Sequence, residues 1–350
     1  MNNNKLPLVS ILVLNYNGKQ FLDDCFSSLL DSSYPNYEII MIDNLSTDDS
    51  VAYTEEKYPQ VKVFQNGING GFSLAYNNAF KIAKGKYFVV LNNDVKVDKN
   101  WLEPLVTLCE NDEQTGAVQP KLLSLLEPHK FEYAGASGGY LDKYGYAFTR
   151  GRIIDFIESD AGQYNDITEV FWTTGAAMMI RASILPETGD MDVDFMHHYE
   201  EIDLCYRINL AGYKLQVAPE SVVYHYGGGI IQYQSYKKLY WNHRNSIFMM
   251  LKSLEKKNLF SFIVIRFLLD LMTFCWALVK WEKLRLKALI NAYLWLIKHI
   301  SLIKNKRKFV QQIRKVDDNY IFKKMYPKSV ALQYFISKKK TFSELMSKQK

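Results

Sequence analysis

Residues 9–17 read VSILVLNYN, an apolar run that ends in three polar residues. A run rich in Val, Ile and Leu predicts a buried strand, and the polar residues then lie at its carboxyl end. The arrangement recurs twice, where the apolar run 39–42 precedes Asp43 and the run 88–91 precedes the tripeptide NND at 92–94. Because ligands bind at the carboxyl ends of strands in an open α/β sheet, these polar side chains predict one binding site.

Strand-like and helix-like patterns alternate from residue 8 to about residue 116. Such alternation is typical of parallel βαβ units, so we expect an α/β fold with a mainly parallel central sheet. Ser46 or Thr47 can cap the second helix, and Gly85 can end the third. The predicted strands are 9–14, 37–42, 61–65 and 87–91, and the predicted helices begin near residues 21, 48, 72 and 101.

The middle of the chain has a weaker pattern. Residues 131–151 mix glycines with tyrosines, and we expect either a flexible loop over a cleft or an irregular connection there. Residues 170–180 predict another strand. Small residues at 174–177 interrupt this strand, where they would let a ligand or another backbone segment approach closely.

A further helix is predicted over residues 199–211, where the apolar spacing is helical and Gly212 follows as a stop. Two short strands are expected next, at 215–217 and 222–224. His225 comes directly after the second of them and is followed two residues later by three glycines. We therefore expect this histidine at the end of a strand, beside a loop.

Composition and charge bound the class of protein. With 350 residues, 48% apolar and 23% charged, the chain can bury a large core, which argues against disorder. Residues 231–350 contain 26 Lys and Arg against 6 Asp and Glu, whereas residues 1–230 contain 17 against 31. We therefore expect a domain over residues 1–230 and a basic, amphipathic helical region over residues 231–350 that faces a different partner.

The cysteines and the amino terminus indicate the compartment. Cys25, Cys109, Cys205 and Cys275 lie far apart, without a Cys-x-x-Cys pair. This spacing favours neither a zinc site nor a disulfide framework. The amino-terminal apolar run lacks a small-residue cleavage site, so no export signal is visible and we expect a cytoplasmic protein.

The basic region contains an apolar stretch at 259–279 whose only charges are Arg266 and Asp270, and a shorter one at 288–303. A membrane span needs about 20 apolar residues, yet a charge at its centre costs roughly 2.5–3.5 kcal/mol. Pairing of Arg266 with Asp270 across one helical turn would reduce that cost. The flanking tryptophans and lysines favour helices that lie in the lipid headgroup layer, with a membrane span and a buried helical subdomain as alternatives.

Several polar residues at strand ends suit nucleotide chemistry. Asp94 and His225 could share a divalent cation that stabilises the charge on departing phosphates. An Asx turn explains Asp94 equally well, and a structural role explains a lone histidine. Asp43 can accept a hydrogen bond from the imide of uracil or thymine. The segment Asn69-Gly70-Gly71-Phe72 opens a helix whose free NH groups can meet a phosphate or a sugar hydroxyl.

Glu200, Glu201 and Asp203 lie in the first turn of the predicted helix 199–211. Sugar transfer with inversion needs a base that takes the proton of the acceptor hydroxyl, and Glu201 is our candidate. We expect Glu200 and Asp203 to support it, with Asp203 paired to Arg207 at i,i+4 spacing. An acidic first turn that complements the helix dipole explains the same residues without catalysis.

Taken together, these motifs resemble family 2 glycosyltransferases of the GT-A fold, particularly bacterial members that build surface polysaccharides, including rhamnosyltransferase-like enzymes. The resemblance covers about residues 7–230, with further similarity in YWNHRN at 240–245 and in the basic tail. Residues 9–17 resemble the opening strand of the family, residues 43–48 its base-binding segment, and residues 69–72 its donor loop.

The resemblance assigns roles to individual residues, and the chain departs from the family pattern twice. Asn92 replaces the first carboxylate of the D-x-D position, and Glu201 stands where aspartate is usual. The implied donor-binding residues are Asn15, Tyr16, Asp43, Asn69, Gly70, Asn77, Asn92 and Asn93; the acceptor side holds Trp172, Thr174 and Gly175; the metal ligands are Asp94, His225 and Asn92; and the catalytic group is Glu201 with Glu200 and Asp203.

We therefore expect an inverting, metal-dependent glycosyltransferase that uses Mg²⁺ or Mn²⁺ and a UDP- or dTDP-sugar, with dTDP-rhamnose among the candidates. The expected acceptor is a lipid-linked glycan in bacterial surface polysaccharide synthesis. The enzyme would be peripheral or monotopic on the inner face of the cell membrane, with its basic tail on anionic lipid.

Two alternatives remain open. A nucleotidyltransferase would carry a Gly-rich, basic phosphate loop after the first strand, and residues 15–18 do not form one. A non-catalytic, nucleotide-sugar-binding membrane scaffold is compatible with Asn92 in place of a carboxylate. Nucleic acid is not an expected partner, because the basic residues accompany Leu, Ile and Trp rather than an RNA-reading motif.

Overall fold

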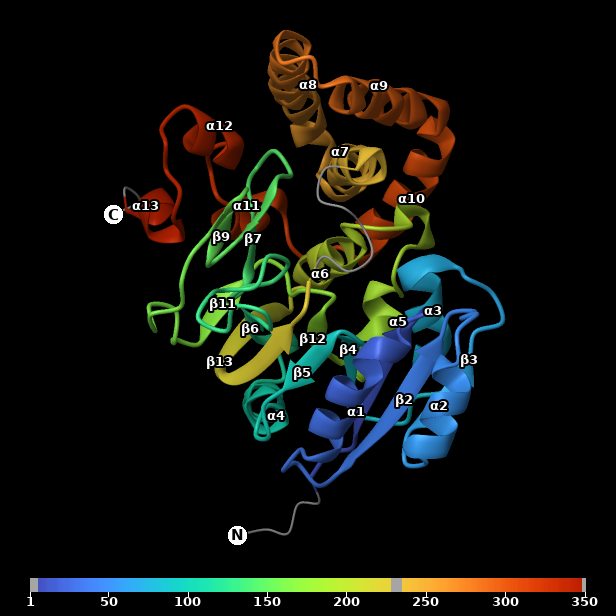
Figure 1. The fold of residues 1–350 in the computed structure, drawn as a ribbon. Coiled ribbons are helices and arrows are strands. Elements are labelled where there is room, and N and C mark those ends of the chain that lie inside the picture. The colour runs from blue at the N-terminus through green and yellow to red at the C-terminus, as the bar shows by residue number, and fades with distance from the viewer. Residues whose placement is uncertain (1–5, 228–234, 348–350) are drawn as a thin grey trace.

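A nine-stranded mixed sheet forms the centre of the computed structural model, which describes residues 6–227 and 235–347 (Figure 1). The strand order is β11-β13-β6-β12-β4-β1-β2-β3, with β5 paired to β13. One apolar core lies on each face of this sheet. Its strands are β1 Val9–Asn15, β2 Tyr37–Asp43, β3 Lys62–Gln65, β4 Tyr87–Asn92, β5 Val95–Val97, β6 Thr115–Ser124, β11 Thr168–Val170, β12 Ala177–Arg181 and β13 Lys214–His225.

The amino-terminal half of the sheet is parallel, as the alternating pattern predicts. Strand β1 pairs in parallel with β2 and β4, and β2 pairs in parallel with β3. The register places Asn15 opposite Asp43, and Leu14 opposite Asn92. The three polar strand ends therefore lie at one edge. The helices around these strands are α1 Leu22–Leu30, α2 Ser50–Lys57, α3 Gly71–Phe80 and α4 Leu102–Asn111.

The other half of the sheet contains antiparallel pairs. Strand β12 lies antiparallel between β4 and β6, and β13 is parallel to β6. The prediction of two short strands at 215–217 and 222–224 is wrong, because they form the single strand β13, with a register shift between Ala218 and Val222. Strand β5 pairs with the end of β13, where Val95 stands opposite His225. This pairing brings Asp94 beside the histidine.

Residues 131–151 are not the expected flexible loop. They contribute to a four-stranded antiparallel sheet, whose very short strands carry no readable alternation of polar and apolar residues. Gly145 and Gly151, with φ of 84° and 124°, make backbone turns that other residues rarely adopt. Phe148 anchors the sheet in an apolar cluster with Tyr326 and other carboxyl-terminal side chains. The strands are β7 Gly139–Leu141, β8 Ala147–Thr149, β9 Arg152–Ile153 and β10 Phe156–Ile157.

The carboxyl-terminal helices share a core with the central sheet. Phe248, Met250 and Leu296 belong to the same buried cluster as Leu12 and Ile202. The domain boundary near residue 230 stays a prediction, because apolar packing is continuous across it. The remaining helices are α5 Leu185–Thr188, α6 Glu200–Leu210, α7 Tyr236–Ser253, α8 Lys256–Val279, α9 Lys283–Lys298, α10 Ile300–Ile313, α11 Asp318–Lys324, α12 Val330–Phe335 and α13 Phe342–Met346.

Helix α8 has a polar contact surface and an exposed apolar one. The predicted pair is confirmed: Arg266 Nε lies 3.0 Å from Asp270 Oδ2, and both side chains are buried. Arg266 also donates to Tyr144 O at 2.7 Å and to Ser246 Oγ at 2.9 Å, which fixes this side of the helix against the protein. Among the described helices, α8 alone is by itself long and apolar enough to cross a membrane; α9 and α10 together meet the same test but bend by 73°.

Candidate active site

His225 lies between two carboxylates at the end of β13. Its Nε2 is 3.0 Å from Asp94 Oδ1 and 3.2 Å from Asn92 Nδ2, and its Nδ1 is 3.2 Å from Glu132 Oε1. The other oxygen of Glu132 accepts hydrogen bonds from the backbone NH groups of Ala134 and Gly135 at 2.6 and 3.1 Å. All three ionisable side chains are at least 86% buried. The structure thus brings together the predicted pair Asp94 and His225 and adds Glu132.

The charges of this cluster stabilise one another. Burial by itself lowers the pKa of His225, but the carboxylates of Glu132 and Asp94 raise it to about 10. Burial likewise raises the pKa of Asp94, and the nearby His225 more than offsets this, so that the Asp94 pKa lies below its ordinary value. The carboxylates and the histidine therefore each favour the charged form of the other.

Asp94 and His225 suit a divalent cation with few protein ligands. Mg²⁺ is commonly held by one or two carboxylates together with substrate phosphates and water, and imidazole nitrogen is a common ligand of transition-metal ions. A carboxylate that holds the second ring nitrogen is the usual support of a ligating histidine, and Glu132 occupies that position. Within residues 6–227 and 235–347, no set of three or more His, Cys, Asp or Glu side chains is arranged to hold a metal ion by itself.

Asn15 joins the three polar strand ends. Its Nδ2 donates to Ser50 Oγ at 2.9 Å and lies within 3.5 Å of Asp43 Oδ1, while its Oδ1 accepts from Asn93 Nδ2 at 2.7 Å. Asn15 is fully buried, so its observed contacts orient Asp43 and Asn93. Tyr16, which follows it, is 43% exposed. The donor-binding roles of these residues stay predictions.

The predicted donor loop is held by amide side chains. Asn69 Oδ1 accepts from Asn44 Nδ2 at 3.0 Å, and Gly70 precedes the first residue of α3. Asn77 Nδ2 donates to Met191 O at 2.8 Å, and its Oδ1 accepts from Met191 N at 3.0 Å. Both polar groups of Asn77 therefore bind backbone, which gives this residue a structural role; its predicted contact with a donor stays untested.

Glu200 and Glu201 form the first two positions of helix α6. Glu200 is buried and Glu201 is partly exposed, and one carboxylate oxygen of each is buried without a hydrogen-bond partner among the described residues. Burial raises the pKa of Glu201 to about 7. Burial and the charge of Glu201 raise the pKa of Glu200 well above its ordinary value. A carboxylate with a pKa near neutrality is suited to accept a proton.

The short loop of residues 174–176 contacts both helix α6 and strand β4. A Cβ placed on Gly175 would lie 2.9 Å from Phe72 Cζ and 3.6 Å from Glu201 Cβ, so this glycine lies close to the candidate base. The next carbonyl, that of Ala176, accepts from Asn92 N at 3.0 Å. Thr174 N donates to Gln119 Oε1 of β6, which fixes the position of the loop. Glu201 and the end of β4, which precedes Asp94, therefore both lie beside residues 174–176.

Trp172 packs inside the protein rather than at the surface. It is 3% exposed, and its indole NH donates to Tyr140 O at 2.8 Å. A Cβ on Gly139 would lie 2.1 Å from the indole ring, so the two backbones approach closely there. The structure gives Trp172 a packing role, and its predicted contact with an acceptor stays untested.

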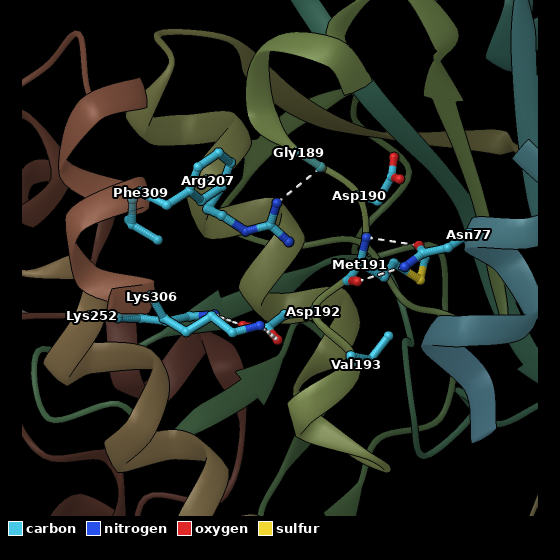
Figure 2. A pocket seen from close by; sticks show the side chains of 11 residues that line it. Asn77, Gly189, Asp190, Met191, Asp192, Val193, Arg207, Lys252, Lys306 and Phe309 are labelled. Carbon is cyan, nitrogen blue, oxygen red and sulfur yellow. Dashed lines mark hydrogen bonds and ion pairs between the residues drawn. The ribbon is translucent and has the colours of Figure 1, made fainter. Parts of the chain in front are cut away.

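Asp203 belongs to a buried network of ion pairs. The predicted pair is confirmed, with Arg207 Nε 3.0 Å from Asp203 Oδ2, and Lys252 of α7 lies 2.9 Å from the other oxygen. Lys252 and Lys306 of α10 both contact Asp192. Figure 2 shows Asp192, Arg207, Lys252 and Lys306 around a cavity of about 240 Å³ between residues 189–193, α6, α7 and α10. Positive and negative groups alternate there, so Asp203 fixes α6 to the carboxyl-terminal helices.

Sequence reasoning missed Glu132 and the polar residues of α7. Glu132 lies in the segment expected to be a loop, and no spacing rule connects it to His225. Arg244 and Asn245 lie in YWNHRN, which the sequence comparison with the family had singled out without giving the residues a role. Both side chains are buried. The available sequence signal was the polar pair Arg244-Asn245 directly before the largely apolar run 246–251, because polar groups beside a core segment need partners when they are buried.

Comparison with known proteins supports the family and the fold. The family described as Glycosyl transferase family 2 matches residues 10–185, just over half of the chain. An uncharacterized glycosyltransferase of Haemophilus influenzae is 33% identical over 124 residues, which are 35% of this chain and 38% of the relative. The O-antigen biosynthesis protein RfbC of Myxococcus xanthus is 27% identical over 230 residues, which are 63% of this chain and 17% of the relative.

These matches span less than half the length of either relative. Among solved structures, GalNAc-T7 with UDP, GalNAc and Mn²⁺ is similar at a TM-score of 0.57 and 20% identity, over 73% of this chain and 49% of that chain. At this identity the likeness concerns the fold, which is the GT-A arrangement of a mainly parallel α/β sheet.

Proposed function

We propose that this chain, which belongs to glycosyl transferase family 2, is an inverting glycosyltransferase of surface polysaccharide synthesis. It moves a sugar from a UDP- or dTDP-sugar, with dTDP-rhamnose among the candidate donors, to a lipid-linked glycan. One observation carries the proposal: the candidate base Glu201 and the strand end that precedes the Asp94–His225 pair both lie beside the loop 174–176. The relative named for O-antigen biosynthesis supports the polysaccharide assignment.

Glu201 would act as the base of this transfer. Its carboxylate takes the proton of the acceptor hydroxyl while the hydroxyl oxygen forms a bond to the anomeric carbon. The bond between that carbon and the diphosphate breaks on the opposite side, and the diphosphate keeps the electron pair. Attack from the side opposite the leaving group inverts the anomeric configuration. Glu200 and Asp203 support the base by burial and by fixing α6.

Asp94 and His225 would hold Mg²⁺ or Mn²⁺, with Asn92 beside them. The cation supplies positive charge to the departing diphosphate. The pairing of Asp94 with His225 and the support of that histidine by Glu132 favour this choice. The Mn²⁺ and UDP of the solved GalNAc-T7 structure, which shares the fold, are consistent with it. Asp43, oriented by Asn15, remains the candidate partner of the donor base.

The test is turnover of a panel of UDP- and dTDP-sugars, including dTDP-rhamnose, with lipid-linked acceptors and Mn²⁺ or Mg²⁺. Release of nucleoside diphosphate and the anomeric configuration of the product are measured. Glu201→Gln should reduce transfer by about 10²–10⁴-fold, the usual contribution of a general base. The matched control is Glu56→Gln, an exposed residue of α2. Transfer by Glu201→Gln at the unmodified rate would contradict the proposal, as would a product of retained configuration.

We further propose that α8 and α9 lie on the inner membrane surface. Of the 32 large apolar side chains that are exposed in residues 6–227 and 235–347, 17 lie between Phe260 and Ile300. On α8, Phe260, Val264, Phe267 and Leu271 follow helical spacing and form one stripe. Exposed apolar area of this extent marks an interaction surface, and the basic composition of the region favours anionic lipid. An interfacial position leaves the buried contacts of Arg266 intact, whereas a separate span would break them.

Vesicle sedimentation tests this surface. The unmodified protein should bind vesicles that contain phosphatidylglycerol and bind phosphatidylcholine vesicles less. The double variant Phe267→Glu, Leu271→Glu should lose most of this binding, because two charges would enter the apolar layer. The control is Ile82→Glu, an apolar residue just after the end of α3 that is 43% exposed. Equal binding by both variants would rule out the proposed surface.

A further inference from the structure

The turn before helix α6 has an unusual backbone. Met196, His198 and Tyr199 have φ of 64°, 63° and 72°, in a region that side chains other than glycine rarely adopt. No glycine lies between residues 196 and 201 to relieve this strain. A strained backbone persists only where the surrounding structure holds it, and such strain gathers at functional sites.

Two side chains of α7 hold this turn. Asn245, fully buried, donates from Nδ2 to the carbonyls of Phe195, His197 and His198 at 3.0, 2.8 and 2.7 Å. Arg244 Nη2 donates to Asp194 O at 2.6 Å and to Phe195 O at 2.8 Å. Consecutive residues of one helix thus bind four backbone carbonyls, those of His197 and His198 within the turn and those of Asp194 and Phe195 just before it.

Other contacts hold these two side chains in place. Arg244 Nε donates to Asn245 Oδ1 at 2.6 Å, and the guanidinium lies 4.5 Å from the ring of Trp295 on α9. On the opposite side of the turn, the hydroxyl of Tyr199 donates to Gly145 O at 3.1 Å. The turn is therefore fixed from both sides before α6 begins.

The positions of Glu200 and Glu201 depend on the turn that precedes them. Tyr199 caps α6 in a left-handed conformation without a side-chain hydrogen bond, and Glu200 and Glu201 are the next two residues. No ion pair or side-chain hydrogen bond from another described residue positions either carboxylate. Their place in the site then depends on the backbone that precedes them.

We propose that Arg244 and Asn245 are positioning residues for Glu201, which they place by holding the strained turn 196–199. This inference rests on the proposed function, in which Glu201 is the base. It gives the first helix of the basic region a part in catalysis, in addition to the membrane contact proposed for α8 and α9. When a base is displaced by about 1 Å, the rate falls on the order of 10²-fold. Donor binding at the ends of β1, β2 and β4 should be unaffected.

The test compares Asn245→Ala and the milder Arg244→Lys with a matched control. Gln311→Ala is the control, because Gln311 also donates to three backbone carbonyls, those of Lys252, Ser253 and Leu254, at the far end of α7. We expect kcat to fall about 10–100-fold in the two turn variants, with the KM for donor and the affinity for UDP within twofold of the unmodified protein. In Gln311→Ala all three quantities should stay within twofold.

Two further measurements separate positioning from simple destabilisation. In a Glu201→Gln background, Asn245→Ala should cause no additional loss of kcat, because its effect passes through Glu201. Backbone hydrogen exchange at residues 196–201 should increase in Asn245→Ala and stay unchanged in Gln311→Ala. Should Asn245→Ala fail to fold, the same kcat and exchange measurements on Arg244→Lys decide the matter.

Each outcome has a distinct meaning. Unchanged kcat in a folded turn variant, equal exchange at 196–201, or an independent loss of kcat in the Glu201→Gln background would overturn the positioning role. Full activity of Glu201→Gln alone would instead overturn the proposed function, whatever the exchange data show.

Discussion

At the end of β13 two buried carboxylates contact the same histidine, whereas at the start of α6 two carboxylates lie next to each other without an ion pair among the described residues. Asp94 and Glu132 share His225, whose pKa they raise. Glu200 and Glu201 each leave one buried oxygen unpaired, and their pKa values rise because burial disfavours the charged form.

The difference separates two kinds of chemistry in one site. A carboxylate paired with a histidine stays ionised, and the two side chains can share a metal ion once the histidine releases its proton. A carboxylate without a partner holds a proton more tightly and can exchange it near neutral pH. The site at Asp94 and Glu132 is therefore suited to bind a cation, and the site at Glu200 and Glu201 is suited to accept a proton. The following experiments test whether this division holds.

Among the experiments that follow, the largest effect should come from Asp94. Asp94→Asn removes the carboxylate that contacts His225, and kcat/KM for the donor should fall by about 10²–10³-fold, the usual cost of one electrostatic stabilising group. The measurement is donor turnover at saturating Mn²⁺. Asp98→Asn, an exposed residue near the same strand end, is the control. Equal activity of the two variants would show that Asp94 has no part in the reaction.

A smaller effect is expected from the residue that supports His225. Glu132→Gln keeps the shape of the side chain but removes its charge, and the affinity for Mn²⁺ in the presence of UDP should fall by about 10–100-fold. Titration of free Mn²⁺ by electron paramagnetic resonance measures this directly. The exposed Glu127→Gln serves as the control. Affinities that match in both variants would remove Glu132 from the metal side.

The ionisation of Glu201 should set the pH dependence of kcat/KM. Because the base must be deprotonated and burial raises the pKa of Glu201 to about 7, kcat/KM should fall about tenfold per pH unit below pH 7 and level off above it. A pH profile of donor turnover between pH 5 and 9 shows the inflection. An inflection near the ordinary glutamate pKa would mean that Glu201 is not the group that titrates.

The smallest effect concerns stability. The folded pKa of Glu201 lies above its unfolded value of 4.5, so its charge destabilises the fold above pH 7, and this penalty vanishes below about pH 4.5. Glu201→Gln should therefore stabilise the protein at pH 8 by roughly 1 kcal/mol, less than the pKa shift alone implies because water reaches the side chain. Thermal unfolding at pH 8 and pH 4.5 measures the difference. A lower melting temperature at pH 8 would contradict this account.

The sequence predicted most of the geometry at the ends of β1, β2 and β4. The apolar runs before Asn15, Asp43 and Asn92 fix three strands, and parallel pairing of these strands brings their ends together. The helix that begins with Glu200 and the pair between Asp203 and Arg207 follow from spacing alone. These features depend on residues close in sequence or on one repeated pattern, so they can be recognised locally.

Other features depend on contacts between distant segments. Strand β13 and the small sheet from residue 139 to 157 were misread, because bulged or two-residue strands carry no periodic signal. Glu132 meets His225, and Asn245 meets His197, across 93 and 48 residues of chain. No local sequence pattern predicts a contact between residues so far apart in the chain.

By itself the sequence determined the strand and helix types, the polar residues at the strand ends and the charge contrast between the two parts of the chain, because each follows from the chemistry of neighbouring residues. Only the tertiary structure decided which carboxylates have partners. Packing brings Glu132 to His225 and leaves Glu200 and Glu201 unpaired. That choice sets the pKa values of the site, since a buried carboxylate is governed by the charges that the fold places around it.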